Sequence, residues 1–509
     1  MREQLALLPG YLTAHLQLTL LALAAGIAIS IPTGVFVTRR RWLDQPVVAI
    51  ASAIQTIPAL ALLAVMVPAL AVLGLRSIGF LPAFVGLVLY SILPILRGTV
   101  TGLDTVDPAV VEAARAVGMT PGQRLRRVEL PLAMPVIVAG IRTATVWTVG
   151  MATLSTPVGA PSLGNYIFSG LQTRNFNAVL VGSVAAAALA LVLDGLVRSL
   201  GASLTARRRQ STATVLAVFA LLYAFTVLSF ARDTRVALRG RVVVGAKTFT
   251  EQYILSRILA SQIGDANGEP VDVAASLGST VAFDALRTGQ IDAYVDYSGT
   301  IWSTVMHRDA AHVTRAQVLD GVRRFLQDKY GITLVGALGF ENAYALAMRR
   351  VQADRLGIRR IGDLAPVAPR LTIGGDYEFF ERPEWAALRQ VYGLSFAQMR
   401  SMDPSLMYQA AARGDVDVIS AFSTDGRIAA FDLTVLTDDR GAIPPYDAIV
   451  LAGPRLSRNA AAIEELRRLS GTIDADRMRR MNRAVDQDHA DPAAVAAAFL
   501  RDLRAHASY

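Results

Sequence analysis

The chain has 509 residues, 53% of them hydrophobic, with a mean hydropathy of +0.40 and a formal net charge of +9. This length and apolarity exclude an ordinary soluble protein of one domain. The absence of cysteine excludes disulfides, CxxC metal sites, thiol nucleophiles and a lipid-modified N-terminal cysteine.

The excess positive charge belongs to the first half of the chain. Residues 1–240 hold 19 Arg and Lys against 8 Asp and Glu, whereas residues 241–509 hold 31 against 33. Positive charge beside apolar segments orients membrane spans, so we interpret it as a topology signal and expect no nucleic-acid partner.

Apolar runs dominate the same half, and each is long enough to cross a bilayer, which takes about 20 residues. They lie at 16–38, 47–74, 78–97, 132–157 and 178–200, with a sixth at 213–230. The first run is too long for the core of a cleaved signal peptide. We therefore predict a membrane all-α domain with about six spans, with residues 1–209 as the transmembrane domain and 210–240 as the sixth span and linker.

Arginine clusters predict the orientation of these spans. They follow the first and fifth runs, at Arg39–Arg41 and at Arg198 with Arg207–Arg209, and they occupy the loop before the fourth run at Arg115–Arg127. All three fall on one side, the cytoplasm, if the N-terminus is outside. We expect a multi-pass protein of the bacterial cell (inner) membrane with residues 241–509 extracytoplasmic.

The loop Val111–Pro131 is a charged island between two apolar runs. Asp107–Pro108 predicts a helix start, residues 109–116 are strong helix formers, and Gly118 permits the turn that ends the helix. These features alone fit any amphipathic loop helix as well as a docking element.

The motif residues of this loop are similar to the EAA loop of ABC importer permeases. They are Glu112, Ala113, Ala114 and Gly118, followed by Leu130–Pro131. The resemblance implies that a separate ABC ATPase subunit docks here, with small Ala113 and Ala114 allowing close approach. Because such pores are built from two permease halves, we expect a homodimer surrounded by membrane lipid.

Two further features lie near the fourth span. Arg142 is inside the apolar run, and an ionisable residue at that depth is either pathway-lining or paired, facing the bundle. The loop 157–171 resembles osmoprotectant permeases, although Pro161–Ser162 stands where a pair of glycines is usual.

After Gly240 the pattern changes to short β-branched strands that alternate with helices. The predicted strands are Arg241–Val244, Val271–Ala274, Leu371–Ile373, Val416–Ser420 and Leu433–Leu436, after a linker at Ala231–Gly240. This alternation predicts an α/β module with mainly parallel sheets over residues 241–509.

Several ordered segments of this module resemble the substrate-binding proteins of glycine betaine, choline and carnitine importers. They are 243–255, 277–300, 339–349, 423–440 and 444–448. The resemblance implies an α/β two-lobed type II periplasmic-binding-protein domain. It also implies that the chain crosses to the second lobe near 346–350 and returns near 441–446.

The resemblance further implies a cage for a quaternary ammonium, formed by Tyr297, Tyr344, Phe422 and Tyr446. A trimethylammonium group has no hydrogen to donate, so aromatic faces attract its charge and match its methyl groups. Phe422 stands where tyrosine is common. Each of these aromatics, taken alone, also fits an ordinary core side chain.

Polar residues near the cage are expected to bind the other end of the ligand. Thr250 is predicted to cap the helix that starts at Glu251, and the free N–H groups there favour a carboxylate or hydroxyl. Gln252 corresponds to a ligand contact in relatives. Thr424, with the following Asp425–Gly426, either shapes the site or only makes a turn.

Glu341 lies three residues before Tyr344, where asparagine is common. If its carboxylate faces the cleft, it favours a ligand with an extra donor, such as ergothioneine. If it faces solvent, it has no bearing on the ligand.

Enzyme signatures are weak. The stretch 240–248 resembles a phosphate loop, but Ala246 replaces the glycine required before Lys247, so no ATPase is encoded. Glu251 with Asp296, and Asp438 with Asp439, are interpreted as surface acids rather than acid/base pairs. No metal-ligand spacing joins the histidines, which are His15, His307, His312, His489 and His506. We expect no enzyme activity, cofactor or metal.

The sequence therefore predicts the permease and substrate-binding subunit of an ATP-driven ABC importer for quaternary-ammonium osmoprotectants such as glycine betaine, choline and carnitine. One alternative is an ABC importer for ergothioneine or a related zwitterion. A distant alternative is a membrane-anchored ligand sensor, which would need a cytoplasmic output domain in place of the short loops.

Overall fold

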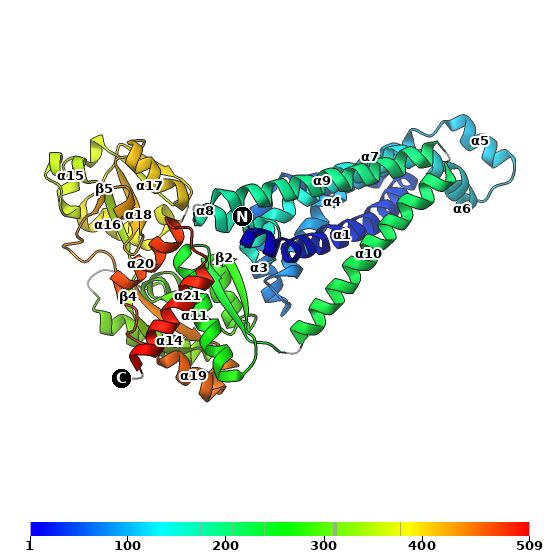
Figure 1. Cartoon of the computed structure of the whole chain (residues 1–509). Coiled ribbons are helices and arrows are strands. Elements are labelled where there is room, and N and C mark those ends of the chain that lie inside the picture. Colours follow the sequence, from blue (N-terminus) through cyan, green and yellow to red (C-terminus); the bar gives the residue numbers. More distant parts are fainter. Residues whose placement is uncertain are drawn as a thin grey trace. The chain divides into compact units, whose positions relative to one another are not determined.

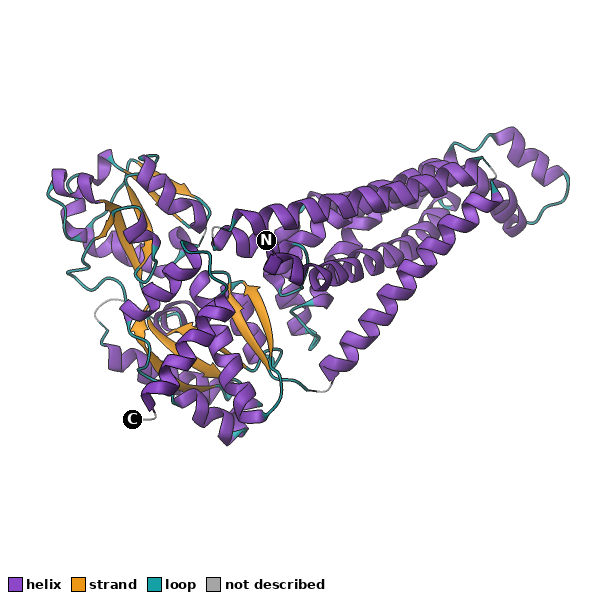
Figure 2. Cartoon of the chain, viewed as in Figure 1, coloured by secondary structure: helices purple, strands orange, loops and turns teal. Residues whose placement is uncertain are grey.

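The computed structural model describes residues 2–173, 175–206, 208–238, 240–308, 313–376 and 378–507. The chain divides into two compact units, one built on Met1–Phe168 and Asn177–Gly240 and the other on Arg241–Tyr509. Figure 1 labels the elements, and Figure 2 shows the strands gathered in the second unit, whereas the first is helical.

The first unit is a bundle of long helices joined by short ones. Its helices are α1 (Arg2–Arg39), α2 (Asp44–Thr56), α3 (Ala59–Val72), α4 (Phe80–Asp104), α5 (Pro108–Ala116), α6 (Pro121–Arg124), α7 (Leu130–Ala152), α8 (Gly164–Gln172), α9 (Phe176–Thr205) and α10 (Arg209–Leu238). A π-helical turn, Leu125–Glu129, leads into α7. Among the described residues, five helices are long and apolar enough to cross a membrane, or six spans if the bent pair α2–α3 counts as one.

Two predictions about the spans are wrong in detail. The run 47–74 is not one straight span, because α2 and α3 meet at 99°. The break falls at Ile57–Pro58: proline lacks an amide hydrogen and forces the preceding residue into the extended region that Ile57 adopts. The segment 231–240 is not a linker throughout, since α10 continues to Leu238.

The bundle packs around α1, α4 and α7. Leu23, Ile95 and Ala144 bring one apolar residue from each of these helices into a shared cluster. A Cβ atom at Gly140 would lie 2.5 Å from the carbonyl oxygen of Pro94, so only glycine allows α7 to approach α4 this closely.

Arg142 is paired, which is one of the two roles that the sequence allowed. Its Nε and Nη2 atoms lie 2.9 and 3.0 Å from the two carboxylate oxygens of Asp194 on α9. Such a bidentate pair satisfies both ions in apolar surroundings and joins α7 to α9.

The second unit contains two five-stranded sheets. The first has the order β2-β1-β3-β10-β4, with β2 (Asp272–Leu277), β1 (Val243–Lys247), β3 (Ala293–Tyr297), β10 (Asp447–Ala452) and β4 (Thr333–Glu341). The second has the order β7-β6-β8-β5-β9, with β7 (Gln398–Ser401), β6 (Thr372–Gly375), β8 (Val418–Phe422), β5 (Tyr344–Arg349) and β9 (Leu433–Val435). We call the regions around them lobe 1 and lobe 2.

Helices cover both sheets. They are α11 (Thr250–Asn267), α12 (Ser279–Arg287), α13 (Ser298–Thr300), α14 (Arg315–Tyr330), α15 (Arg350–Leu356), α16 (Pro383–Tyr392), α17 (Pro404–Arg413), α18 (Arg427–Ala430), α19 (Ala460–Arg467), α20 (Ala475–Asp486) and α21 (Pro492–Ala507). Apolar residues of α11 pack with those of α19, α20 and α21 in one core, which returns the C-terminal helices to lobe 1.

All five predicted strands are confirmed, with ends shifted by a few residues. The expectation of mainly parallel sheets is wrong, because β10 runs antiparallel to β3 and β4, and β5 runs antiparallel to β8 and β9. The chain leaves lobe 1 at Glu341 and enters lobe 2 at Tyr344, earlier than the predicted 346–350. It returns between Val435 and Asp447.

The Arg142–Asp194 pair yields a test of bundle stability. Replacing only one partner, in Arg142→Met or Asp194→Leu, strands an ion in an apolar bundle and should lower the melting midpoint of the purified protein by several degrees. The double variant removes both charges and should recover most of that loss. Differential scanning fluorimetry in detergent measures this, and a double variant as unstable as the sum of the two losses contradicts the pairing.

Candidate ligand-binding site

The four aromatic residues predicted for a cage come together between the lobes. Tyr297 ends β3 and Tyr446 precedes β10 in lobe 1, whereas Tyr344 begins β5 and Phe422 ends β8 in lobe 2. The β5–β8 register places Tyr344 opposite Phe422, and their ring centroids lie 5.1 Å apart. The Tyr344 and Tyr446 rings are 6.4 Å apart and nearly perpendicular.

Phe249 is a fifth ring that the sequence analysis missed. It immediately precedes α11, and its ring stacks at 6.1 Å on Tyr297 and at 6.2 Å on Phe422. Phe249 therefore links a lobe 1 ring to a lobe 2 ring. Its place beside Thr250 and Glu251, in a stretch already singled out, was the available signal. We call Phe249, Tyr297, Tyr344, Phe422 and Tyr446 the aromatic cluster.

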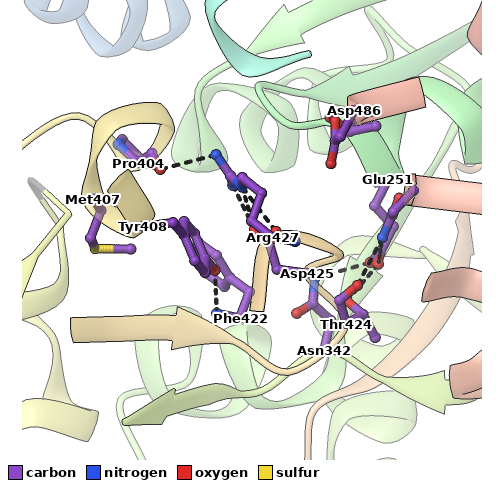
Figure 3. Close-up of polar contacts among 12 residues, drawn as sticks. Glu251, Asn342, Pro404, Met407, Tyr408, Phe422, Thr424, Asp425, Arg427 and Asp486 are labelled. Carbon is purple, nitrogen blue, oxygen red and sulfur yellow. Dashed lines mark hydrogen bonds and ion pairs between the residues drawn. The ribbon is translucent and has the colours of Figure 1, made fainter. Parts of the chain in front are cut away.

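Glu251 lies beneath this cluster and is 2% exposed, so its interpretation as a surface acid is wrong. Its carboxylate accepts hydrogen bonds from the Tyr297 hydroxyl, from Thr424 Oγ1 (2.7 Å) and from the side-chain amides of Asn342 (3.0 Å) and Asn482 (3.3 Å). Figure 3 shows Asn342 and Thr424 converging on it. Burial raises the pKa of Glu251, against the opposing effect of these bonds.

The partners of Glu251 come from both lobes. Tyr297 ends a lobe 1 strand, Asn342 lies where the chain crosses over, and Thr424 follows the lobe 2 strand β8. Asn482 also donates to the Thr424 carbonyl oxygen at 3.2 Å. The first turn of α11 is therefore covered by lobe 2, which is why an acidic residue in a helix's first turn is not at the surface here.

Other predicted polar residues have protein partners. Thr250 is not the helix cap: Phe249 occupies that position, and the Thr250 hydroxyl donates to Asp486 at 2.6 Å. Gln252 Nε2 donates to the Val295 carbonyl oxygen at 3.0 Å and to the Tyr297 hydroxyl at 3.2 Å, so it orients a cluster ring.

The turn after Thr424 supports Phe422. Asp425 forms a bidentate pair with Arg427, whose guanidinium lies 4.3 Å from the Tyr408 ring centroid. The Phe422 backbone N–H donates to the Tyr408 hydroxyl at 3.0 Å. Figure 3 shows this chain of contacts from Asp425 to Phe422.

Asp296, the other acid interpreted as a surface residue, is 1% exposed and pairs with Lys247. Lys247 Nζ lies 5.7 Å from the Tyr297 ring centroid. Asp438 accepts backbone N–H bonds from Ala442 and Ile443 and therefore holds a loop.

Arg382, whose side chain is 10% exposed, is a further cation near the cluster that was not predicted. Its guanidinium carbon lies 5.1 Å from the Tyr344 ring centroid, and its Nε atom lies 3.3 Å from Glu384. Glu384 also accepts a hydrogen bond from the Tyr446 hydroxyl, which links lobe 2 to lobe 1. The Glu341 side chain is 39% exposed and lies 3.7 Å from Arg315, so its charge has a protein partner.

The loop with the EAA-like motif forms the predicted helix. The side chain of Asp107 accepts the Ala109 N–H at 2.8 Å, and α5 ends before Gly118, whose φ is +78°. Glu112 and Ala113 are exposed, whereas Ala114 is buried. Glu129, after this loop, is buried and pairs with Arg124 at 2.7 Å and with Arg39 of α1.

Comparisons with known proteins cover both units. Residues 26–210 match the family model of the binding-protein-dependent transport system inner membrane component. Residues 240–502 match the model of the substrate binding domain of ABC-type glycine betaine transport system, which is more than half of the chain.

Individual relatives match either most of this chain or only part of it. The ergothioneine transport permease/ergothioneine binding protein EgtU of Helicobacter pylori (strain G27) is 31% identical over 462 residues, which span 88% of this chain and 82% of that protein. The osmoprotectant import permease protein OsmW of Salmonella typhimurium (strain LT2) is 42% identical over 200 residues, 38% of this chain and 93% of the relative.

Among solved structures, a glycine betaine/carnitine/choline ABC transporter is 30% identical, with a TM-score of 0.46 over 51% of this chain and 98% of that one. Both family models and a relative that spans most of the chain agree with the two-unit architecture. The chain is a multi-pass membrane protein that belongs to the ABC importer family, with a permease and a substrate-binding domain on one polypeptide.

Proposed function

We propose that this subunit imports a trimethylammonium zwitterion of the betaine class. The observation that carries the proposal is the aromatic cluster, to which lobe 1 and lobe 2 each contribute rings. Faces from several directions suit a cation that cannot donate hydrogen bonds, and each is worth about 0.5–2 kcal/mol. Closure of the lobes then completes the site only around a ligand of this kind.

The buried cations beside the cluster support a zwitterion over a simple ammonium. Arg382 lies against the Tyr344 ring, and Lys247 lies near the Tyr297 ring. Lys247 and Arg382 already pair with Asp296 and Glu384, and a ligand carboxylate close to the rings would give each cation a second charge-assisted partner. Choline has no carboxylate, so it would offer Arg382 and Lys247 no new partner.

Two kinds of betaine remain candidates. The permease half resembles osmoprotectant, choline and carnitine permeases, which favours glycine betaine or carnitine. EgtU, a relative that aligns over both units, is described as an ergothioneine permease and binding protein, which favours ergothioneine. Both ligands carry a trimethylammonium and a carboxylate, so the cage argument is common to them.

The permease unit supplies the coupling to ATP. We infer that a separate ABC ATPase subunit binds α5, where exposed Glu112 and Ala113, buried Ala114 and the turn at Gly118 form the docking surface. Two copies of this chain then complete the pore. The arginine clusters support a topology with α5 in the cytoplasm and residues 241–509 outside, in which each copy carries its own tethered binding domain at high effective concentration.

The cluster can be tested at Phe422. Phe422→Ala removes one aromatic face and should weaken binding of the preferred betaine about ten-fold. Phe422→Tyr keeps the face and should stay within about two-fold. Titration calorimetry of the full chain with glycine betaine, carnitine, choline and ergothioneine measures both. Phe325→Ala, on α14, is the remote control; equal losses in Phe422→Ala and Phe422→Tyr contradict the cage.

Glu251 gives a pH prediction. Its pKa is raised on folding by burial, so its contribution to stability is present below the unfolded value of 4.5 and is lost as pH rises through the folded pKa. The melting midpoint of the native protein relative to Glu251→Gln should therefore fall from pH 4.5 toward neutrality. The comparison isolates Glu251, because all other acids are common to both proteins. A difference that grows with pH contradicts the assignment.

A substitution at Gly118 tests the proposed role of the loop that carries the EAA-like motif in coupling to the ATPase. The Gly118 φ of +78° is in the left-handed region, where an added side chain costs about 1–2 kcal/mol. Gly118→Ala should lower ATP-driven uptake several-fold in proteoliposomes with the ATPase subunit and leave ligand affinity unchanged. Gly122→Ala is the matched control: it lies in the same loop, in α6, with no atom within 4 Å of the added Cβ. Equal uptake by the two variants contradicts the role of this turn.

A further inference from the structure

Asp376 is a buried acid beside the aromatic cluster. It directly follows β6, which runs parallel to β8 with Gly374 opposite Ile419. Asp376 and Phe422 therefore leave the sheet at the same carboxyl edge, where α/β sheets bind their ligands. Asp376 is 4% exposed.

The two carboxylate oxygens of Asp376 are in different situations. Oδ1 accepts the backbone N–H groups of Glu378 (2.8 Å) and Phe379 (2.9 Å), which is the role of an acid that starts a helical turn. Oδ2 is buried and has no hydrogen-bond partner among the residues that the structure describes. Capping the turn explains Oδ1 and leaves Oδ2 unexplained, and a buried acceptor without a partner lowers stability.

The surroundings of Asp376 connect it to the aromatic cluster. The Phe379 ring, whose N–H it binds, lies 5.3 Å from the Tyr344 ring centroid. The charged groups that act on Asp376 are Glu378 and Arg382, and Asp376 in turn acts on the Tyr344 hydroxyl. Burial raises the pKa of Asp376, which a donor on the ligand would counteract.

We propose that Asp376 Oδ2 accepts a hydrogen bond from a ring N–H of the ligand, so that the site selects betaines that carry an azole N–H. This inference rests on the proposed function and narrows it to histidine-derived betaines. Glycine betaine has no hydrogen to donate and would leave Oδ2 unpaired. An azole N–H is more acidic than an aliphatic hydroxyl and forms the stronger bond to a carboxylate, so carnitine is a poorer match.

The test is calorimetric titration of the full-length protein with glycine betaine, histidine betaine, ergothioneine and an ergothioneine analogue methylated on its ring nitrogens. The native protein should bind the two ligands with ring N–H groups at least ten-fold more tightly than glycine betaine. Asp376→Asn keeps an oxygen for the turn and replaces the other acceptor by a donor. It should reduce the preference ratio, which is the affinity for the N–H betaines divided by that for glycine betaine, about ten-fold.

Asp417→Asn is the matched control. Asp417 also accepts a backbone N–H, from Thr372 at 2.9 Å, and lies at the opposite end of the same strands. Its preference ratio should equal that of the native protein. If Asp376→Asn does not fold, the native protein with the methylated analogue decides, and a loss of about ten-fold against ergothioneine is expected.

Two results overturn the inference alone: a native protein that binds glycine betaine as tightly as the N–H betaines, or an Asp376→Asn variant with an unchanged ratio. Either result would mean that Asp376 only starts a turn and does not bind the ligand. Failure of the native protein to bind any of the betaines is a different result, because it overturns the proposed function and this inference with it.

Discussion

The binding unit depends on the burial of one carboxylate, that of Glu251, between its lobes. A buried carboxylate is tolerated only when hydrogen bonds replace its water, and here the donors come from lobe 1, from the crossover segment and from lobe 2. The same bonds position the aromatic cluster, since the Tyr297 hydroxyl donates to Glu251 and Gln252 supports it. The polar layer therefore fixes the rings, and opening of the lobes requires the bond between Thr424 and Glu251 to break.

The membrane unit follows the same rule with ion pairs. Arg142 inside the bundle is matched by Asp194, and Glu129, after the loop that carries the EAA-like motif, is matched by Arg124 and Arg39. The ion pair between Glu129 and Arg39 connects the end of this loop to the end of α1. The two pairs of Glu129 join α6 and the π-helical turn that leads into α7 to the end of α1.

Much of this architecture was predictable because its signals are local. Apolar length marked the spans, Asp107–Pro108 and Gly118 marked α5, and the family resemblance marked four rings that do lie together. Ile57–Pro58 was a readable break that was overlooked. Glu251, Arg382 and Asp376 could not be assigned, because their burial depends on contacts distant in sequence. Glu251 needs Asn342 and Thr424, 91 and 173 residues away, Arg382 lies on the Tyr344 ring, and Asp376 lies at an edge shared by two strands. The mixed sheets were missed for the same reason, since strand direction is set by pairings distant in sequence.

The most direct measurement of the central claim is ATP-driven uptake of labelled betaine by the full chain with its ATPase subunit in proteoliposomes. Unlabelled betaines and 3,3-dimethylbutanoate, the uncharged-head isostere of glycine betaine, serve as competitors. Recognition by aromatic faces predicts that betaines compete and that the isostere, equal in shape but lacking the cation, does not. Equal competition by the isostere, or the absence of ATP-dependent uptake of any betaine, would contradict this account.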